Sequence, residues 1–441
     1  MAKASKQTLF VCSNCGEEFI QWAGKCTNCG EWNTLKEFSV AAPSSRSGSY
    51  AGTTETVLPV RMVDVAGQQA TRVPSGFAEI DRVLGGGIVP GSVLLLGGDP
   101  GIGKSTLLLQ VVQRMSKSQG KGVLYVSGEE SPEQIRLRAE RIGAVAEGIS
   151  LLAATDVTAI AASVERTMPS LVVIDSIQTM YDPGFPSTPG SIVQVRESAL
   201  RIQQLAKRLG IPVVFVGHIT KEGTIAGPRT LEHLVDVVLY LEGEPEHDLR
   251  LLRAVKNRFG DATEVGIFSM QESGMAEVGN PGLFLLAERV VAPGSVLTAV
   301  LEGSRPMLIE VQALTTPTAF GYPRRTASGF DLNRLNLLLA VLQKRAGINL
   351  SNQDVFINIV GGLKVKDPAV DAAVCVALAS ALTDRAVGDR MCVVGEVGLS
   401  GEVRRPQQAE KREREVAGLG YQMLSSSKEL KGLLKSAIGF A

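Results

Sequence analysis

Short, largely apolar runs alternate with helical patterns along the middle of the chain, between residues 65 and 275. Apolar runs of this length are typical of strands buried on both faces, and intervening helices join such strands in parallel. The strand-like runs are Val93–Leu96, Val123–Val126, Leu171–Ile174, Val213–Val216 and Val235–Leu241. The pattern predicts an α/β domain with a parallel sheet, and ligands of such sheets bind at the carboxyl ends of the strands.

A glycine-rich loop follows the first run and precedes a helical pattern that starts at Leu107. It consists of Gly98, Asp99, Pro100, Gly101, Ile102, Gly103, Lys104, Ser105 and Thr106, which match G-x-x-x-x-G-K-[ST]. In this motif backbone N–H groups surround the phosphates of ATP, and the lysine reaches the β- and γ-phosphates. We predict this role for Lys104, and we predict that Ser105 holds Mg²⁺. A chance glycine loop would leave the flanking strand and helix unexplained.

Acidic residues follow the second and third runs, at the same predicted edge of the sheet. Glu129 and Glu130 come shortly after the second run, and a carboxylate there can polarise the water that attacks the γ-phosphate. Glu129 is the first candidate for this role and Glu130 the second. Asp175 directly follows the third run and is placed to hold Mg²⁺ through its water shell. The alternative is a helix cap formed with Ser176.

His218 follows the run that ends at Val216, where a sensor of the γ-phosphate would lie. The loop after it contains glycines and lacks a packing pattern, so we expect its cations Lys221 and Arg229 to contact DNA phosphates. The alternative for His218 is a partly buried histidine whose hydrogen bonds are satisfied.

Two cations flank one residue in the segment Lys256-Asn257-Arg258, immediately after the strand-like run Leu251–Val255. On an extended segment these two side chains point to the same side. Beside their own P-loop they would be redundant, but across a subunit boundary they could neutralise transition-state charge on a neighbour's γ-phosphate. We therefore predict catalytic roles for Lys256 and Arg258. The alternative is a solvated strand end.

The N-terminal residues 1–38 hold two Cys-x2-Cys pairs separated by ten residues, with a glycine directly after each pair. The four cysteines are Cys12, Cys15, Cys26 and Cys29. This spacing predicts a zinc ribbon, and four filled ligand positions make the Zn²⁺ structural. Two disulfides are the alternative. Trp22 and Trp32 either cover the metal core or present a surface for DNA or a partner, and residues 39–64 form a flexible linker rich in small and polar residues.

Taken together, these motifs resemble the RadA (Sms) family of bacterial DNA-repair proteins over the whole length of the chain. The resemblance rests on the cysteine ribbon, on Arg72–Gly76 and Leu84–Gly87, on the P-loop, and on Lys256–Gly260. It implies a RecA-like ATPase core that assembles into a homo-hexameric ring similar to DnaB-type helicases. It also implies a role on single-stranded DNA, in branch migration of recombination intermediates in concert with the recombinase RecA.

The C-terminal residues 285–441 resemble the peptidase domain of Lon, an α+β domain. The resemblance is carried by Val355–Leu382 and Val393–Val403. Lon cleaves peptides with a nucleophilic serine that a lysine activates. Ala369 occupies the serine position, and the lysine position falls near Glu410, next to Lys411. Without a hydroxyl at position 369 no acyl-enzyme can form, so we expect no proteolysis.

Lysine and arginine together equal aspartate and glutamate in number, so any contact with DNA must come from local patches. Basic pairs in the C-terminal domain could follow a DNA backbone. The candidates are Arg324 with Arg325 and Lys344 with Arg345, with Lys364, Lys366, Arg404 and Arg405 as further cations. Ordinary solvated charge is an equally good account of each cluster. No run is long enough to span a membrane, and we expect a cytoplasmic protein.

The leading hypothesis is a DNA-dependent ATPase of recombination and repair, a ring-shaped motor that uses ATP, Mg²⁺ and structural Zn²⁺. A filament-forming strand-exchange protein would share the ATPase core and is the second hypothesis. A peptidase is disfavoured by Ala369, and a KaiC-like signalling protein would share the Glu129-Glu130 pair.

Overall fold

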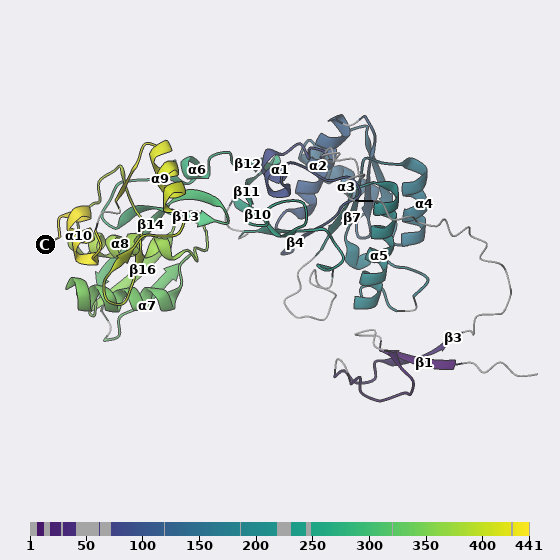
Figure 1. The fold of residues 1–441 in the computed structure, drawn as a ribbon, viewed down its shortest axis with the longest axis horizontal. Coiled ribbons are helices and arrows are strands. Elements are labelled where there is room, and N and C mark those ends of the chain that lie inside the picture. The colour runs from purple at the N-terminus through teal and green to yellow at the C-terminus, as the bar shows by residue number, and fades with distance from the viewer. Residues whose placement is uncertain are drawn as a thin grey trace, which may run out of the picture. The chain divides into compact units, whose positions relative to one another are not determined.

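The computed structural model describes most of the chain. The described residues are 7–12, 18–27, 30–40, 61, 72–118, 120–185, 187–217, 231–243, 248–319, 321–424 and 427–440. The chain divides into two compact units, and each is described by itself (Figure 1). The first unit comprises Met1–Leu241, Ala254–Ala262 and Glu272–Met275, and the second comprises Glu242–Arg253, Thr263–Gln271 and Ala276–Ala441.

The N-terminal segment forms a small antiparallel sheet. Its strands are β1 (Gln7–Cys12), β2 (Glu18–Phe19) and β3 (Leu35–Val40), in the order β2-β1-β3. Its core is formed by Cys12, Cys26 and Leu35. Phe10, Phe19 and Ala23 pack against this core, and the core is small among the described residues of the ribbon. Small modules of this size commonly depend on metal for their stability.

The larger part of the first unit contains a parallel sheet, as the apolar runs predict. Six parallel strands follow one another in the order β9-β4-β8-β7-β5-β6. They are β4 (Val93–Gly98), β5 (Val123–Ser127), β6 (Ile149–Ala153), β7 (Leu171–Asp175), β8 (Val213–Val216) and β9 (Val237–Glu242). The register pairs Ser127 with Asp175, so the carboxyl ends of β5 and β7 lie side by side.

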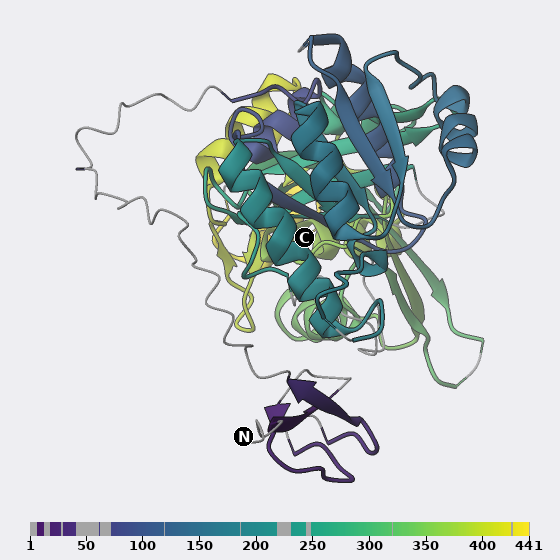
Figure 2. The same cartoon turned by 90° about the vertical axis from the view of Figure 1, so that its right-hand side faces the viewer.

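Helices connect these strands and cover the sheet (Figure 2). They are α1 (Ala78–Leu84), α2 (Lys104–Ser118), α3 (Pro132–Arg141), α4 (Val157–Thr167), the 3₁₀ turn η2 (Ile177–Thr179) and α5 (Ile192–Leu209). Polar caps fix several helix starts; at α3, Ser131 and Gln134 form a capping box. Apolar side chains of α4 and α5 pack on one face of the sheet.

Strand β10 (Leu249–Asn257) begins in the second unit and ends in the first. It pairs antiparallel with β11 (Val265–Gln271), with Leu249 opposite Ser269, and β12 (Gly274–Glu277) follows. Side chains of β10 and β11 join the apolar core of the second unit, among them Leu251 and Ile267. These strands therefore contribute to the unit that contains most of the C-terminal residues.

The second unit is α+β and contains a mixed six-stranded sheet in the order β15-β16-β14-β13-β17-β20. The strands are β13 (Ser295–Glu302), β14 (Arg305–Pro317), β15 (Arg325–Ser328), β16 (Gln353–Ile359), β17 (Met391–Val393) and β20 (Gln422–Leu424). Two short strands, β18 (Glu396–Val397) and β19 (Val403–Arg404), pair with each other. The central pairs β13–β14 and β14–β16 are antiparallel.

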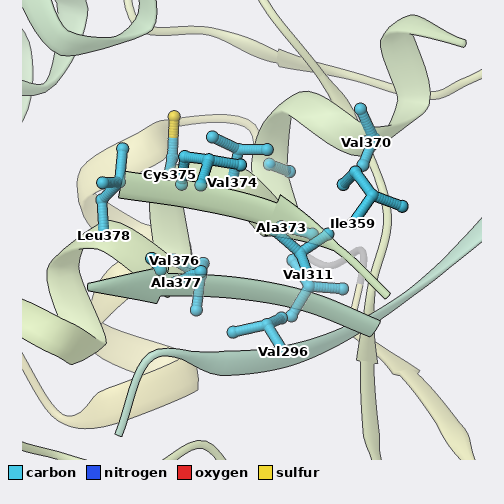
Figure 3. Close-up of a cluster of buried hydrophobic side chains, with 14 of the residues drawn as sticks. Val296, Val311, Ile359, Val370, Ala373, Val374, Cys375, Val376, Ala377 and Leu378 are labelled. Atoms are coloured by element: carbon cyan, nitrogen blue, oxygen red, sulfur yellow. The ribbon is translucent and has the colours of Figure 1, made fainter. Parts of the chain in front are cut away.

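Helix α8 (Asp371–Thr383) lies at the centre of this unit. It is apolar around its circumference, as is typical of a helix that is enclosed on all sides, and Figure 3 shows its residues Ala373, Val374 and Ala377 in one buried cluster with Val296 and Val311 of the sheet. Around it lie α6 (Pro281–Leu286), α7 (Leu332–Val341), the π turn η4 (Leu342–Ala346), the 3₁₀ turn η5 (Pro368–Val370), α9 (Ala409–Gly418) and α10 (Leu430–Ile438).

The buried end of α8 carries one charge. Asp371 has no solvent exposure and is paired with Arg334 of α7, whose Nε donates to Asp371 Oδ1 at 3.1 Å. None of the helices in the described part of the chain, α8 included, combines the length and apolarity needed to traverse a bilayer.

Candidate functional site

The glycine-rich loop lies where the sequence places it, between the end of β4 and the start of α2. Gly101 and Gly103 have φ angles of +76° and +109°, which side-chain-bearing residues rarely adopt. Gly98 faces a second restriction, because a Cβ atom there would lie 2.6 Å from the Leu241 carbonyl oxygen. The loop can take this course around a ligand only with glycine at these positions.

Lys104 is buried at the first position of α2. Its ammonium donates to the carbonyl oxygens of Gly98 and Asp99, both at 2.9 Å. Burial lowers the pKa of Lys104, while the carboxylates of Asp175, Asp99 and Glu129 act in the opposite direction. These three acids therefore lie within electrostatic range of the P-loop lysine. A glycine-rich loop with one buried ammonium and several carboxylates within electrostatic range fits a nucleoside triphosphate with Mg²⁺.

Asp175 ends β7 and is held by a buried tyrosine. The hydroxyl of Tyr125 donates to Asp175 Oδ2 at 2.5 Å. Burial and the neighbouring Asp175 raise the pKa of Tyr125 well above its ordinary value, so the phenol stays protonated and donates a hydrogen bond. The alternative of a cap formed with Ser176 is wrong, because Ser176 precedes η2 without any side-chain cap hydrogen bond.

A tight turn after β5 carries Glu129 and Glu130. Both of their backbone N–H groups donate to Ser127 Oγ, at 3.3 and 2.9 Å. The N–H of Gly128 donates to the carbonyl of Asp175 at 2.9 Å, and a Cβ atom at position 128 would lie 2.0 Å from Thr179 Oγ1. The turn is thus held closely against the end of β7.

The two glutamates have different partners. Glu130 forms an ion pair with Arg138 of α3, with Nη2 and Oε2 at 2.8 Å. Glu129 instead accepts a hydrogen bond from Ser176 Oγ at 2.7 Å. Ser176 follows Asp175 directly, so Glu129 is turned toward the strand that carries the acid predicted to hold Mg²⁺.

Lys256 and Arg258 reach the same segment, as their spacing predicts. The Lys256 ammonium donates to the carbonyls of Glu232 and Val235, at 2.6 and 2.8 Å. Arg258 forms an ion pair of 3.3 Å with Asp236, and its side chain is 54% exposed. Burial, followed by the charge of Arg258, lowers the pKa of Lys256.

Asp236 fixes where Arg258 lies relative to the P-loop of its own subunit. Its Oδ2 accepts from the Val93 N–H at 3.1 Å, and Lys207 lies 3.9 Å from its Oδ1. Val93 is the first residue of β4, and Gly98 is the last. Five residue steps of about 3.3 Å separate them, roughly 16 Å along the strand. Arg258 is therefore held at the end of the sheet opposite to its own P-loop.

The segment that carries Arg258 is tied to α1. Asn257 Nδ2 donates to the carbonyl of Val83 at 3.2 Å, and Asn257 Oδ1 accepts from the N–H of Phe259 at 2.9 Å. Arg72 donates to the carbonyls of Leu84 and Phe259, at 2.7 and 2.6 Å. Asn257 and Arg72 belong to runs that carry the family resemblance, but sequence reasoning assigned neither of them a role.

Three predicted site residues, His218, Lys221 and Arg229, lie outside the described residues. The same holds for Cys15 and Cys29 of the ribbon, whereas Cys12 and Cys26 are buried together in its core. Among the described residues no group of three or more potential metal ligands occurs.

The two tryptophans of the ribbon are largely exposed. Trp22 is 59% and Trp32 68% exposed, and each ring has an atom 3.8 Å from the position of a Cβ atom at Gly24. Because Cys15 and Cys29 lie outside the described residues, the two interpretations of these rings, a cover for the metal or a surface for DNA or a partner, both stay predictions.

The basic pairs of the second unit differ in exposure. Arg325 donates to the Leu350 carbonyl at 2.9 Å and also to that of Gln353, and burial lowers its pKa. Its guanidinium thus caps a turn of its own chain. Arg324, Lys344 and Arg345 are exposed at the surface.

The region that resembles the Lon active site holds a different ion pair. Ala369 is 1% exposed in η5, and its N–H donates to Asp367 Oδ1. The cation beside it is Arg412, which is buried and lies 2.7 Å from Asp367 Oδ2. Glu410 and Lys411 are both exposed. A buried methyl group at position 369 offers no nucleophile, and Arg412, paired with Asp367, offers no lysine amine as a base.

A P-loop between a buried strand and its helix, with acids at the carboxyl ends of two other strands of the same parallel sheet, defines a RecA-like P-loop ATPase. The family model described as AAA domain matches residues 61–224, and the Rubredoxin metal binding domain matches residues 10–37. The chain is 48% identical to the DNA repair protein RadA of Bacillus subtilis, over 96% of this chain and 92% of that protein. It is 47% identical to the DNA repair protein RadA of Listeria monocytogenes, over 98% of this chain and 94% of that protein. The chain belongs to the RadA family of DNA repair proteins.

Two solved structures are similar to about half of the chain. A RadB recombinase is 26% identical and covers 47% of this chain and 99% of its own, with a TM-score of 0.37. A KaiC-like protein from Pyrococcus horikoshii is 20% identical and covers 47% and 99%, with a TM-score of 0.40. The family and the two matched domains establish an ATPase of DNA repair, and they imply ATP with Mg²⁺ and a metal-binding ribbon that implies Zn²⁺.

Proposed function

We propose that this chain is a DNA-stimulated ATPase that works as a homo-hexameric ring on single-stranded DNA. It promotes branch migration and processing of recombination intermediates, together with the recombinase RecA, in the cytoplasm. Its domains are a zinc ribbon over residues 1–38, a linker over 39–64, the ATPase domain over 65–275 and a C-terminal domain over 285–441. The C-terminal domain serves assembly and binding and has no peptidase activity.

The observation that supports a ring is the position of Arg258. Its guanidinium is half-exposed and lies at the end of the parallel sheet opposite to the P-loop of the same subunit. From there it cannot reach the γ-phosphate held by Lys104 of its own chain. If a neighbouring subunit presents its P-loop to this end of the sheet, the Arg258 guanidinium can neutralise charge on that neighbour's γ-phosphate. An arginine supplied in this way by a partner subunit is called an arginine finger.

Within one subunit the hydrolysis roles divide among four residues. Lys104 binds the β- and γ-phosphates, while Ser105 and Asp175 hold Mg²⁺, which neutralises charge on the phosphate oxygens. Glu129 polarises the attacking water, because Glu130 is already engaged with Arg138. Tyr125 keeps Asp175 in place by its hydrogen bond.

The remaining assignments follow the sequence. His218 senses the γ-phosphate, and Lys256 acts with Arg258 toward the neighbour. Contacts to DNA phosphates come from Lys221, Arg229, Arg324, Lys344 and Arg345, whereas the Arg325 guanidinium is engaged by carbonyls of its own chain. The zinc ligands are Cys12, Cys15, Cys26 and Cys29.

The test combines ATP hydrolysis, with and without single-stranded DNA, with the mass of the complex in solution. We expect hydrolysis to rise with DNA and the mass to equal six subunits when an ATP analogue is present. Electron microscopy of the same sample separates closed rings from filaments. Full hydrolysis by a monomer, independent of DNA, would overturn the proposal.

A further inference from the structure

We infer that Ser176 is a positioning residue for hydrolysis, which orients the carboxylate of Glu129 by a hydrogen bond across two adjacent strands. The inference rests on the proposed role of Glu129 as the residue that polarises the attacking water.

The hydrogen-bonding of Ser176 is directed away from its own turn. Its side chain is fully buried and precedes η2, where a serine hydroxyl commonly caps the helix, yet it makes no cap. The hydroxyl instead donates to Glu129 Oε1 at 2.7 Å. A charge-assisted bond from a neutral hydroxyl to a carboxylate is among the stronger hydrogen bonds in proteins.

The backbone around this bond is held from both sides. The N–H of Gly128 donates to the carbonyl of Asp175, and Thr179 Oγ1 donates to the carbonyl of Ser176 at 2.8 Å. Both ends of the bond therefore rest on fixed backbone, while Glu129 itself has three rotatable side-chain torsions. The serine hydroxyl selects one orientation of that carboxylate.

The bond leaves the chemistry of Glu129 intact. A carboxylate has about four acceptor positions, so one donor fixes its direction and leaves capacity to receive a proton from water. Removing the hydroxyl should misplace the carboxylate without altering the P-loop that binds ATP. A misplacement of about 1 Å in such a group is expected to cost up to about 100-fold in rate.

The experiment compares Ser176→Ala with Ser198→Ala in the full chain with single-stranded DNA. Ser198 lies on α5, is equally buried and has no side-chain hydrogen bond, so it controls for loss of a buried hydroxyl. We expect Ser176→Ala to lower kcat by about 10-fold or more. Its KM for ATP and its melting temperature should stay near those of the wild type, and Ser198→Ala should keep the wild-type kcat.

A double-mutant cycle with Glu129→Gln shows whether Ser176 acts through Glu129. In the Glu129→Gln protein, measured in single turnovers, the further change Ser176→Ala should reduce the rate less than about twofold. The positioning role of Ser176 is refuted if Ser176→Ala leaves kcat unchanged, or if it lowers the rate equally in the wild-type and Glu129→Gln proteins. Either result leaves the proposed role of Glu129 in place. If Glu129→Gln itself hydrolyses ATP at the wild-type rate, the catalytic assignment of Glu129 fails, and the inference fails with it.

Discussion

The guanidinium of Arg138 lies 2.8 Å from the carboxylate of Glu130, while the preceding residue, Glu129, accepts a hydrogen bond from Ser176. Two adjacent acids on one turn are thus directed to different elements, one to α3 and the other to the end of β7. Sequence alone leaves either of them able to serve as the catalytic carboxylate.

Glu129→Gln and Glu130→Gln should therefore differ strongly in ATP hydrolysis. General base catalysis typically contributes 10²–10⁴-fold, so we expect Glu129→Gln to lose at least about 100-fold in kcat. Glu130→Gln exchanges an ion pair for a neutral hydrogen bond with Arg138 and should lose less than about fivefold. Both rates can be measured by phosphate release at saturating ATP. The reverse order of the two losses would show that the ion pair breaks during turnover.

Mixing of inactive subunits tests whether Arg258 acts on a neighbour. Lys104→Ala and Arg258→Ala should each be inactive alone, since each lacks one part of every site. In an equimolar mixture, random assembly gives about a quarter of the interfaces an intact P-loop and an intact finger, and activity should return to about that level.

The matched control for this experiment uses two changes on the same side of the interface. Lys104 and Glu129 act in the same subunit. In a mixture of Lys104→Ala with Glu129→Gln every subunit lacks one of these two residues, so the mixture should stay inactive. If the mixture of Arg258→Ala with Lys104→Ala remains equally inactive, Arg258 does not act on the site of a neighbouring subunit.

The buried pair of Arg334 and Asp371 should govern the stability of the second unit. Burial raises the pKa of Asp371, and the guanidinium of Arg334 opposes that shift. Arg334→Met leaves a buried carboxylate without its partner, which typically costs about 3 kcal/mol in the free energy of unfolding. Urea unfolding followed by circular dichroism measures this loss.

The loss should depend on pH in a defined direction. Without Arg334 the pKa of Asp371 in the folded chain rises further above its unfolded value, so the folded state binds the proton more tightly. The destabilisation of Arg334→Met should then be smallest near pH 4, and it should grow as the pH rises through the folded pKa. The double variant Arg334→Met with Asp371→Asn has no buried charge and should show no such dependence. A loss of constant size across pH would place its cause in packing.

Metal removal should affect the ribbon and be visible through its two tryptophans, which are the only ones in the chain. Both rings are already exposed, so a chelator should shift their emission wavelength little. It should instead lower their fluorescence anisotropy, because the metal holds the small fold together. Cys15→Ser should have the same effect, whereas Cys375→Ser in the core of the second unit should not. An unchanged anisotropy after chelation would mean that the ribbon folds without metal.

Much of the ATPase fold can be predicted from the sequence, because its strands are buried on both faces. The runs at Val93 and Leu171 are apolar throughout, and each forms a strand of the parallel sheet. Strand β6 gave no such signal, because it lies at the sheet edge and all of its residues are exposed or only partly buried. The attachment of β10 and β11 to the core of the second unit depends on packing between segments far apart in the chain.

In the candidate site, too, local features can be predicted from the sequence and contacts between distant residues cannot. Spacing predicts Lys104 and Asp175, because the motif and the strand end are local properties of the sequence. It cannot predict that Tyr125 donates to Asp175, since the two residues are fifty positions apart and meet only through the pairing of β5 with β7. Nor could it show that Arg412 pairs with Asp367, because that arginine lies on a helix whose buried face is set by tertiary packing.

The carboxylate of Asp236 is nearly buried, and two cations approach it: Arg258 at 3.3 Å and Lys207 at 3.9 Å. An arginine that swings toward a neighbouring subunit would ordinarily leave such an acid as an isolated buried charge, at a large cost. Here Lys207 stays behind as a counter-ion, and the Val93 N–H continues to donate to the same carboxylate. If Arg258 moves to a neighbouring subunit as proposed, Asp236 keeps a counter-ion and a hydrogen bond, so the strand that leads to the P-loop should keep its stability during that movement.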